Sequence, residues 1–221
     1  MGMKSGVFDL DGTLASTASA HLASWIRALQ ALGVNNVTID ERQLLGRRAT
    51  EIASIILSSL KPTNLRVTAE ELIALKTKFF EQVVKVSVKP MPCAIELTSA
   101  VRKFGGKVIV VTSSLSASAR LILGAIGIKP DVLITGDEVE RGKPDPEPVL
   151  KALSQASLAP SEVFAVGDTI NDVEAYWRSG IRDIYLVKGD VPMHYEDELV
   201  ARFGAKKVES LCDILNVEYP H

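Results

Sequence analysis

The 221-residue sequence lacks the features that define several large classes of protein. Its two cysteines and three histidines are too few and too scattered for a metal-binding cluster. No apolar run approaches the roughly 20 residues of a membrane span, so we expect no membrane partner. The net charge is −2 and no dense basic stripe is present, which argues against nucleic-acid binding.

The location of the protein is predicted from two further observations. The segment from Phe8 to Asp11 carries charge where a secretory signal peptide would need an apolar stretch. Cys93 and Cys212 lie far apart and match no ligand spacing, so we expect free thiols in a reducing compartment. Together these observations predict a cytoplasmic protein. The oligomeric state has no signal in the sequence, and a monomer and a homodimer both stay open.

What the sequence does contain is a series of short apolar runs separated by helical patterns. The runs, each typical of a strand buried on both faces, cover residues 6–8, 107–112, 132–134, 163–166 and 184–187. Helical periodicity occupies residues 93–104, 116–126, 145–156 and 170–179. This alternation predicts an α/β fold with a Rossmann-like, doubly wound parallel sheet.

Residues 15–88 interrupt that alternation with helical periodicity and no convincing strand. The pattern predicts a helix from Ala18 to Leu32, one or two more within 41–60 that stop near Pro62, and another that begins at Thr68 in a capping box. We therefore predict two domains, an α/β core of residues 1–14 and 91–221 and an all-helical cap of residues 15–90 inserted after the first strand.

Polar residues follow several of the predicted strands, where the ligand site of an open parallel sheet lies. Asp9 and Asp11 end the first strand, and two carboxylates this close would be stabilised by a cation such as Mg²⁺. One could act as a nucleophile and the other as a general acid and base. The alternative is an ordinary Asp-Gly turn.

The other strand ends add further candidates. Thr112 and Ser113 could bind a phosphate oxygen or simply cap the next helix. Lys143 could offset negative charge at the site or lie on the surface of a proline-rich loop. Asp168 and Asp172, four residues apart at a helix start, could bind Mg²⁺ or only complement the helix dipole.

In combination and in this order, these segments resemble the haloacid dehalogenase superfamily over essentially the whole chain. The matching residues are Asp9-Leu10-Asp11-Gly12-Thr13-Leu14, then Thr112, then Lys143-Pro144, then Gly167-Asp168 with Asn171-Asp172. The helical insert resembles the small cap of phosphoglycolate-phosphatase-like and β-phosphoglucomutase-like members. Asp11 argues against carbon–halogen chemistry, because the true dehalogenases lack it.

The resemblance implies a role for each matching residue. Asp9 would become an aspartyl phosphate, and Asp11 would protonate the leaving alcohol and then activate water. Thr112 and Lys143 would contact the phosphoryl oxygens, and Thr13 and Ser113 would assist in binding. The Asp9 carboxylate, the Asp11 carbonyl, Asp168 and Asp172 would bind Mg²⁺.

In the cap, the resemblance implies that a Gly-x-Arg stretch reaches the substrate. Arg48 is then the candidate, with Arg47 less favoured, and a guanidinium would suit a carboxylate or a second phosphate. His21, one helical turn before Trp25, is a second candidate for substrate binding, although both could simply pack in the cap. Relatives that cleave phosphonates use a cap lysine, and no residue of this sequence can be assigned to that role.

The sequence therefore predicts a phosphoric monoester hydrolase that acts on a small phosphorylated molecule of the phosphoglycolate or sugar phosphate type. A β-phosphoglucomutase-like transfer would use the same core residues and stays open. A catalytically silent phosphate-binding module is disfavoured, because binding alone would not require a nucleophile and an acid beside the metal ligands.

Overall fold

The computed structural model describes residues 4–35, 38–60, 67–191, 193–195 and 197–219. A six-stranded sheet forms the core, and each pair of neighbouring strands is parallel. In spatial order the strands are β5 (Val132–Ile134), β4 (Val108–Val111), β1 (Ser5–Phe8), β6 (Val163–Gly167), β7 (Ile184–Val187) and β8 (Lys206–Val208). The predicted doubly wound fold is confirmed.

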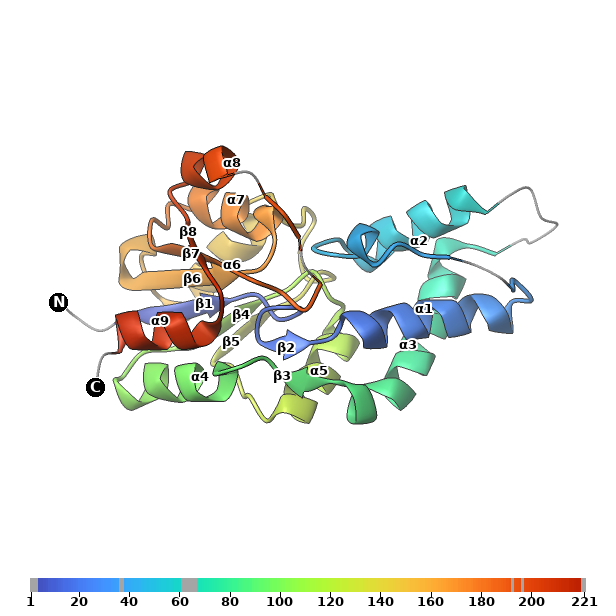
Figure 1. The fold of residues 1–221 in the computed structure, drawn as a ribbon, viewed down its shortest axis with the longest axis horizontal. Coiled ribbons are helices and arrows are strands. Elements are labelled where there is room, and N and C mark those ends of the chain that lie inside the picture. The colour runs from blue at the N-terminus through green and yellow to red at the C-terminus, as the bar shows by residue number, and fades with distance from the viewer. Residues whose placement is uncertain (1–3, 36–37, 61–66, 192, 196, 220–221) are drawn as a thin grey trace.

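Helices cover both faces of the sheet (Figure 1). One face packs against α4 (Ala94–Lys103), α5 (Ser116–Ile126) and α9 (Leu211–Glu218), and the other against α6 (Glu147–Ala156), α7 (Ile170–Arg178) and α8 (Asp197–Arg202). A short 3-10 helix, η2 (Pro160–Glu162), precedes β6. Successive strand residues such as Val7 and Phe8 enter opposite clusters, which is why the central strands β4, β6 and β7 carry apolar side chains on both faces.

The helical insert lies at one end of the core, beyond the carboxyl ends of the strands (Figure 1). It contains α1 (Ala18–Ala31), the 3-10 helix η1 (Glu41–Gln43), α2 (Ala49–Ser59) and α3 (Ala69–Ser87). Trp25, Leu29, Ile52 and Leu72 belong to its own apolar cluster. The capping box predicted at Thr68 is present, and the predicted helix stop near Pro62 lies outside the described residues.

Two short strands that the sequence pattern does not predict connect the cap and the core. These strands, β2 (Ala15–Ser16) and β3 (Lys89–Pro90), pair antiparallel. Each has two residues, too few to show the alternation on which strand prediction depends. Because β2 and β3 pair, the segment that leads into the cap lies beside the segment that returns to the core.

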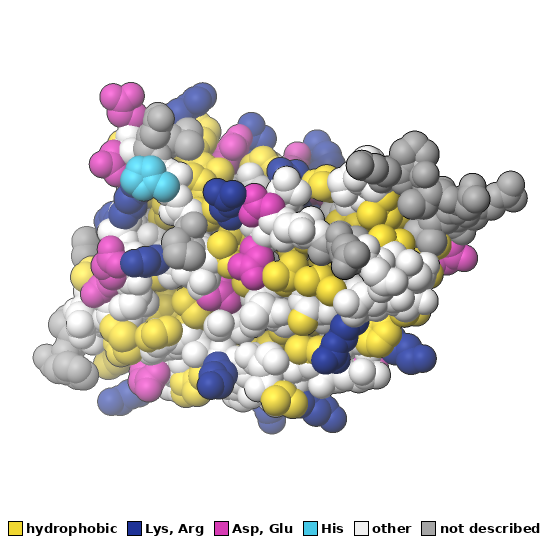
Figure 2. Space-filling view, turned by 45° about the vertical axis from the view of Figure 1, so that its right-hand side comes forward, with side chains coloured by type: hydrophobic (Ala, Val, Ile, Leu, Met, Phe, Trp, Pro, Cys, Tyr) yellow, Lys and Arg dark blue, Asp and Glu magenta, His cyan; other side chains and the backbone are white. Residues whose placement is uncertain are grey.

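Charged side chains of both signs lie on the surface of the protein. The face in Figure 2 has basic and acidic side chains interspersed, with no continuous basic stripe. Within the described part of the chain, no helix combines the length and the apolar character needed to cross a bilayer.

The prediction of two free thiols is wrong. Cys93, directly before α4, forms a disulfide with Cys212 on α9, and the two Cα atoms lie 5.1 Å apart. The two positions are 119 residues apart in the chain, so only the packing of α9 beside α4 reveals their proximity. The expectation of a reducing compartment loses the support that it drew from these cysteines.

Reduction of this disulfide is expected to lower the melting temperature by roughly 5–15 °C, because a cross-link that closes so long a loop stabilises by about 2–4 kcal/mol. Thermal unfolding with and without dithiothreitol measures the effect. The Cys93→Ser/Cys212→Ser double variant should melt at the lower temperature in both conditions. Two titratable thiols in the untreated protein, with no response to the reductant, would contradict the pairing.

Candidate active site

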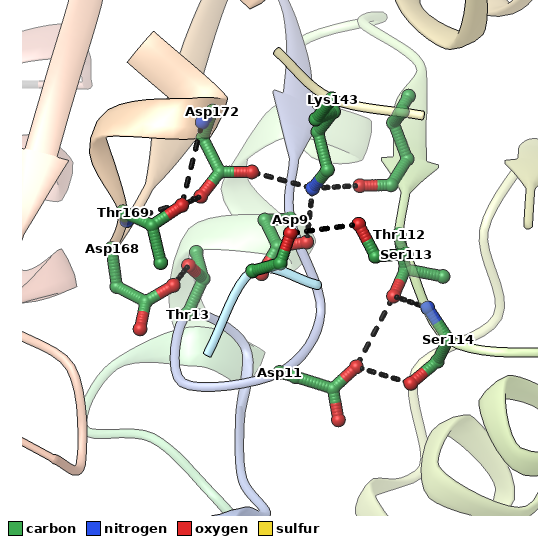
Figure 3. Close-up of polar contacts among 12 residues, drawn as sticks. Asp9, Asp11, Thr13, Thr112, Ser113, Ser114, Lys143, Asp168, Thr169 and Asp172 are labelled. Carbon is green, nitrogen blue, oxygen red and sulfur yellow. Dashed lines mark hydrogen bonds and ion pairs between the residues drawn. The ribbon is translucent and has the colours of Figure 1, made fainter. Parts of the chain in front are cut away.

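Four loops that follow β1, β4, β5 and β6 bring their polar side chains to one place (Figure 3). Asp9 directly follows β1, and its backbone N–H donates to Val166 O at 2.9 Å. Lys143 comes from the loop between β5 and α6, and Asp168 from the loop after β6. The parallel topology explains this convergence, since the carboxyl ends of all these strands lie at the same edge of the sheet.

Lys143 lies between two carboxylates. Its Nζ donates to Asp9 Oδ1 at 2.6 Å, to Asp172 Oδ1 at 2.5 Å and to the Val111 carbonyl at 3.1 Å. Burial opposes the charged form, but Asp172 and Asp9 outweigh it and raise the pKa of Lys143 above its ordinary value. The lysine is therefore a fixed cation beside Asp9, with all three of its N–H donors in use.

Asp9, Asp168 and Asp172 form a buried cluster whose carboxylate oxygens lie within 4.8 Å of one another. Burial, together with the neighbouring carboxylates, raises the pKa of Asp9 to about 8 and raises the pKa of Asp168 well above its usual value; Lys143 opposes both shifts. Such a cluster favours a hard cation, and three carboxylates are a donor set that suits Mg²⁺. Gly12, at a φ of 78°, leaves space for the Asp168 carboxylate, because a Cβ at position 12 would lie 2.2 Å from Asp168 Oδ2.

Asp11 lies outside that cluster and points toward the cap. Its Oδ1 accepts from Thr17 Oγ1 and from His21 Nε2, each at 2.8 Å, and its Oδ2 accepts from Thr112 Oγ1 at 3.1 Å and Ser114 Oγ at 2.8 Å. Burial alone would raise its pKa, but His21 and the hydrogen bonds from Ser114 and Thr17 lower it below the ordinary range. The carboxylate is thus in the basic form and held at a fixed orientation.

The remaining core candidates fall in different places. Thr112 and Ser113 line the cavity between cap and core, and Ser113 Oγ donates to the Gly46 carbonyl at 3.4 Å. Thr13 is fully buried and donates to Asp168 Oδ1 at 3.2 Å (Figure 3). Its contact is therefore with a carboxylate of the cluster rather than with the cavity.

The cavity has a volume of about 70 Å³ and is bounded by Asp9 and Asp11 on one side and by cap residues on the other. His21 lies on its wall, stacked on Phe80 at 4.5 Å. Burial and Lys76 lower the pKa of His21, against the effect of Asp11, so the imidazole is neutral and donates from Nε2 to Asp11. His21 thus contacts both the cavity and Asp11.

Lys76, on α3, lines the cavity and is a site residue that sequence reasoning missed. Its Nζ lies 2.9 Å from His21 Nδ1 and 4.4 Å from the Phe80 ring centre, and burial lowers its pKa to about 8. The available signal was a lysine on an apolar helix face, between Leu72 and Phe80 at four-residue spacing.

The two cap arginines point in different directions. Arg48, the predicted substrate-binding residue, donates from Nη1 to the Glu140 carbonyl at 2.9 Å and from Nη2 to the Val139 carbonyl at 3.3 Å. Arg47 lines the cavity. Arg48 thus joins the cap to the loop that precedes Lys143, and Arg47 is the arginine placed to meet a ligand.

Asp9 lies at a strand end within the carboxylate cluster and contacts the buried Lys143, and Asp11 accepts from four donors. This arrangement is typical of an enzyme of phosphoryl transfer. The chain belongs to the haloacid dehalogenase-like hydrolases, whose family pattern matches residues 7–186.

Similar proteins include several phosphatases. The N-acetylmuramic acid 6-phosphate phosphatase of Pseudomonas aeruginosa is 30% identical over 96% of this chain and 98% of its own length. A phosphoglycolate phosphatase of Aquifex aeolicus is 27% identical over 85% and 86% of the two chains. The crystal structure of CbbY from Rhodobacter sphaeroides in complex with phosphate shares the fold at a TM-score of 0.86 and 23% identity, with 96% of each chain covered. The protein is therefore a phosphatase of this family.

Proposed function

We propose that the protein hydrolyses a small phosphomonoester of the phosphoglycolate or sugar phosphate type through an aspartyl phosphate on Asp9, with the aid of Mg²⁺. The observation that carries the proposal is that Asp9 and Asp11 lie in different surroundings. Asp9 belongs to the carboxylate cluster and contacts Lys143 at 2.6 Å, whereas Asp11 is turned toward the cavity and the cap. A nucleophile and a proton carrier require this division.

In the first step an Asp9 carboxylate oxygen attacks phosphorus, and the bond from phosphorus to the leaving oxygen breaks. The electron pair goes to that oxygen, which takes a proton from Asp11. A phosphate dianion bound beside Asp11 adds negative charge and so favours the protonated form that this step needs. Lys143 and the Thr112 hydroxyl would contact the phosphoryl oxygens, and each would exchange one of its present hydrogen bonds for that contact.

In the second step a water molecule attacks the phosphorus of the aspartyl phosphate. Asp11 takes the proton of that water, inorganic phosphate leaves, and Asp9 is regenerated. The four hydrogen bonds that Asp11 accepts favour its ionised form, which is the form that this step requires.

Asp9, Asp168 and Asp172 would bind the Mg²⁺ ion, with the Asp11 carbonyl as a further candidate. When bound, the ion supplies positive charge that brings the phosphate dianion and the Asp9 carboxylate together. Thr13 fixes Asp168 by its hydrogen bond, and the capping contacts of Thr169 with Asp172 fix the third carboxylate.

The leaving group would lie in the cavity between cap and core, which both Asp11 and residues of the cap line. Incubation of the protein with Mg²⁺ and a panel of phosphoglycolate, glycerol phosphate, hexose phosphates and N-acetylmuramic acid 6-phosphate is expected to release inorganic phosphate from at least one of them. A folded protein that hydrolyses no member would contradict the proposal. Conversion of one sugar phosphate isomer into another without phosphate release would favour the mutase alternative.

Arg47→Ala is expected to raise KM for phosphoglycolate about tenfold and to leave KM nearly unchanged for glycerol phosphate, whose leaving group is uncharged. The reason is that a guanidinium on the cavity wall would meet the carboxylate of the first leaving group and has no anionic partner on the second. Steady-state kinetics on both substrates measure the ratio. Equal changes on the two substrates would exclude Arg47 as the group that selects the leaving group.

A further inference from the structure

Asp190, in the loop that follows β7, connects the core to the start of the cap. Its Oδ2 accepts from the backbone N–H groups of Thr17 at 2.7 Å and Ala18 at 3.0 Å. These are the first residues of α1, and Thr17 is its N-cap residue. A carboxylate more than 170 positions away in sequence therefore caps the first helix of the cap domain.

The usual local cap is absent from this helix end because Thr17 has another partner. The Thr17 side chain makes no capping hydrogen bond to α1 and donates instead to Asp11 Oδ1 at 2.8 Å. One turn further along α1, His21 donates to the same oxygen. The helix end that Asp190 fixes thus carries both donors to Asp11 Oδ1.

The second carboxylate oxygen of Asp190 indicates that the residue does more than stabilise the fold. Oδ1 is buried and makes no hydrogen bond to any residue that the structure describes. A buried acceptor without a partner costs stability, so such a group calls for another explanation. The loop also lies against the carboxylate cluster, since a Cβ at Gly189 would be 2.4 Å from Asp168 Oδ2.

We propose that Asp190 is a positioning residue, which fixes the start of α1 so that Thr17 and His21 hold the general acid and base Asp11 in its working orientation. The proposal rests on the phosphatase mechanism above and adds a residue to it. Asp190 acts through the backbone of Thr17 and Ala18 and takes no part in the chemical steps.

A leaving-group comparison tests this role. Protonation by Asp11 matters for an alkyl phosphate and little for p-nitrophenyl phosphate, whose leaving group departs without a proton. In single-turnover experiments at saturating Mg²⁺, Asp190→Ala should slow release of the alcohol from glycerol phosphate about ten- to a hundredfold. Release of p-nitrophenol should change less than threefold. Asp190→Asn, which keeps one acceptor oxygen, should fall between Asp190→Ala and the wild type.

Asp213→Ala is the matched control. Asp213 accepts from the backbone N–H groups of Glu209 and Ser210 at the start of α9, a helix that contributes no residue to the cavity. Its loss should reduce stability and leave the rates on both substrates as in the wild type. Equal slowing of both substrates by Asp190→Ala, or no slowing, would overturn the proposal, even if the wild type hydrolyses phosphate esters. A wild type without turnover would instead contradict the proposed function itself.

Discussion

Asp9→Asn is expected to reduce turnover of every substrate by at least about 10³-fold while the protein stays folded. The amide has the shape of the carboxylate but cannot act as the nucleophile, so the aspartyl phosphate does not form. Lys143 keeps its contacts with Asp172 and the Val111 carbonyl, so the side chain beside position 9 is still held in place. Phosphate release measured under saturating Mg²⁺ checks the expectation.

Two controls make this result specific to the chemistry. The melting temperature of Asp9→Asn should not fall, because the substitution removes a carboxyl whose charged form is disfavoured by burial and by the neighbouring carboxylates. Rapid acid quench with a ³²P-labelled substrate should trap label on the wild type and none on the variant. Turnover by Asp9→Asn above about one per cent of the wild-type rate would remove Asp9 from the role of nucleophile.

The core of the site was predictable because chain position alone determines where strand ends meet. Asp9, Lys143, Asp168 and Asp172 each follow an apolar strand or its loop, and a parallel sheet brings such positions to one edge. Their residue types then restrict the chemistry, since a buried lysine among carboxylates is suited to binding a phosphate and a cation. Local patterns were therefore sufficient for this part.

The contacts that escaped prediction depend on packing between segments that are distant in sequence. The partners of Asp190 are more than 170 positions away, and the disulfide spans 119 positions, so neither has a local signature. The contacts of Arg48 could not be predicted either. Arg47 and Arg48 are neighbours in the sequence, and only the folded structure shows that Arg48 contacts the loop before Lys143 while Arg47 lines the cavity. The edge strand β8, with two lysines in three residues, lacks the apolar run that identified the central strands.

Removal of divalent metal is expected to abolish turnover, with at least about a 10³-fold loss in EDTA and full recovery with Mg²⁺. Without a cation, Asp9, Asp168 and Asp172 repel both one another and an incoming phosphate dianion, and Lys143 offsets only part of that charge. Asp168→Asn should need a much higher Mg²⁺ concentration for half-maximal activity. Undiminished turnover after exhaustive chelation would contradict a catalytic metal.

The same cluster predicts how stability and metal binding depend on pH. In the metal-free folded protein burial raises the pKa of Asp9 from its ordinary value of 3.8 to about 8, so between these values the folded state carries a proton that the unfolded state has lost. Metal-free stability should therefore fall as pH rises from about 4 to 8, and Mg²⁺ should restore it by binding the folded state alone. Because the cation competes with the protons on Asp9 and Asp168, Mg²⁺ affinity should rise with pH, by up to about tenfold per pH unit for each proton displaced. Calorimetry of Mg²⁺ binding in two buffers of different ionisation enthalpy would detect the released proton. A Mg²⁺ affinity that does not change with pH would show that Asp9 is already ionised before the metal binds.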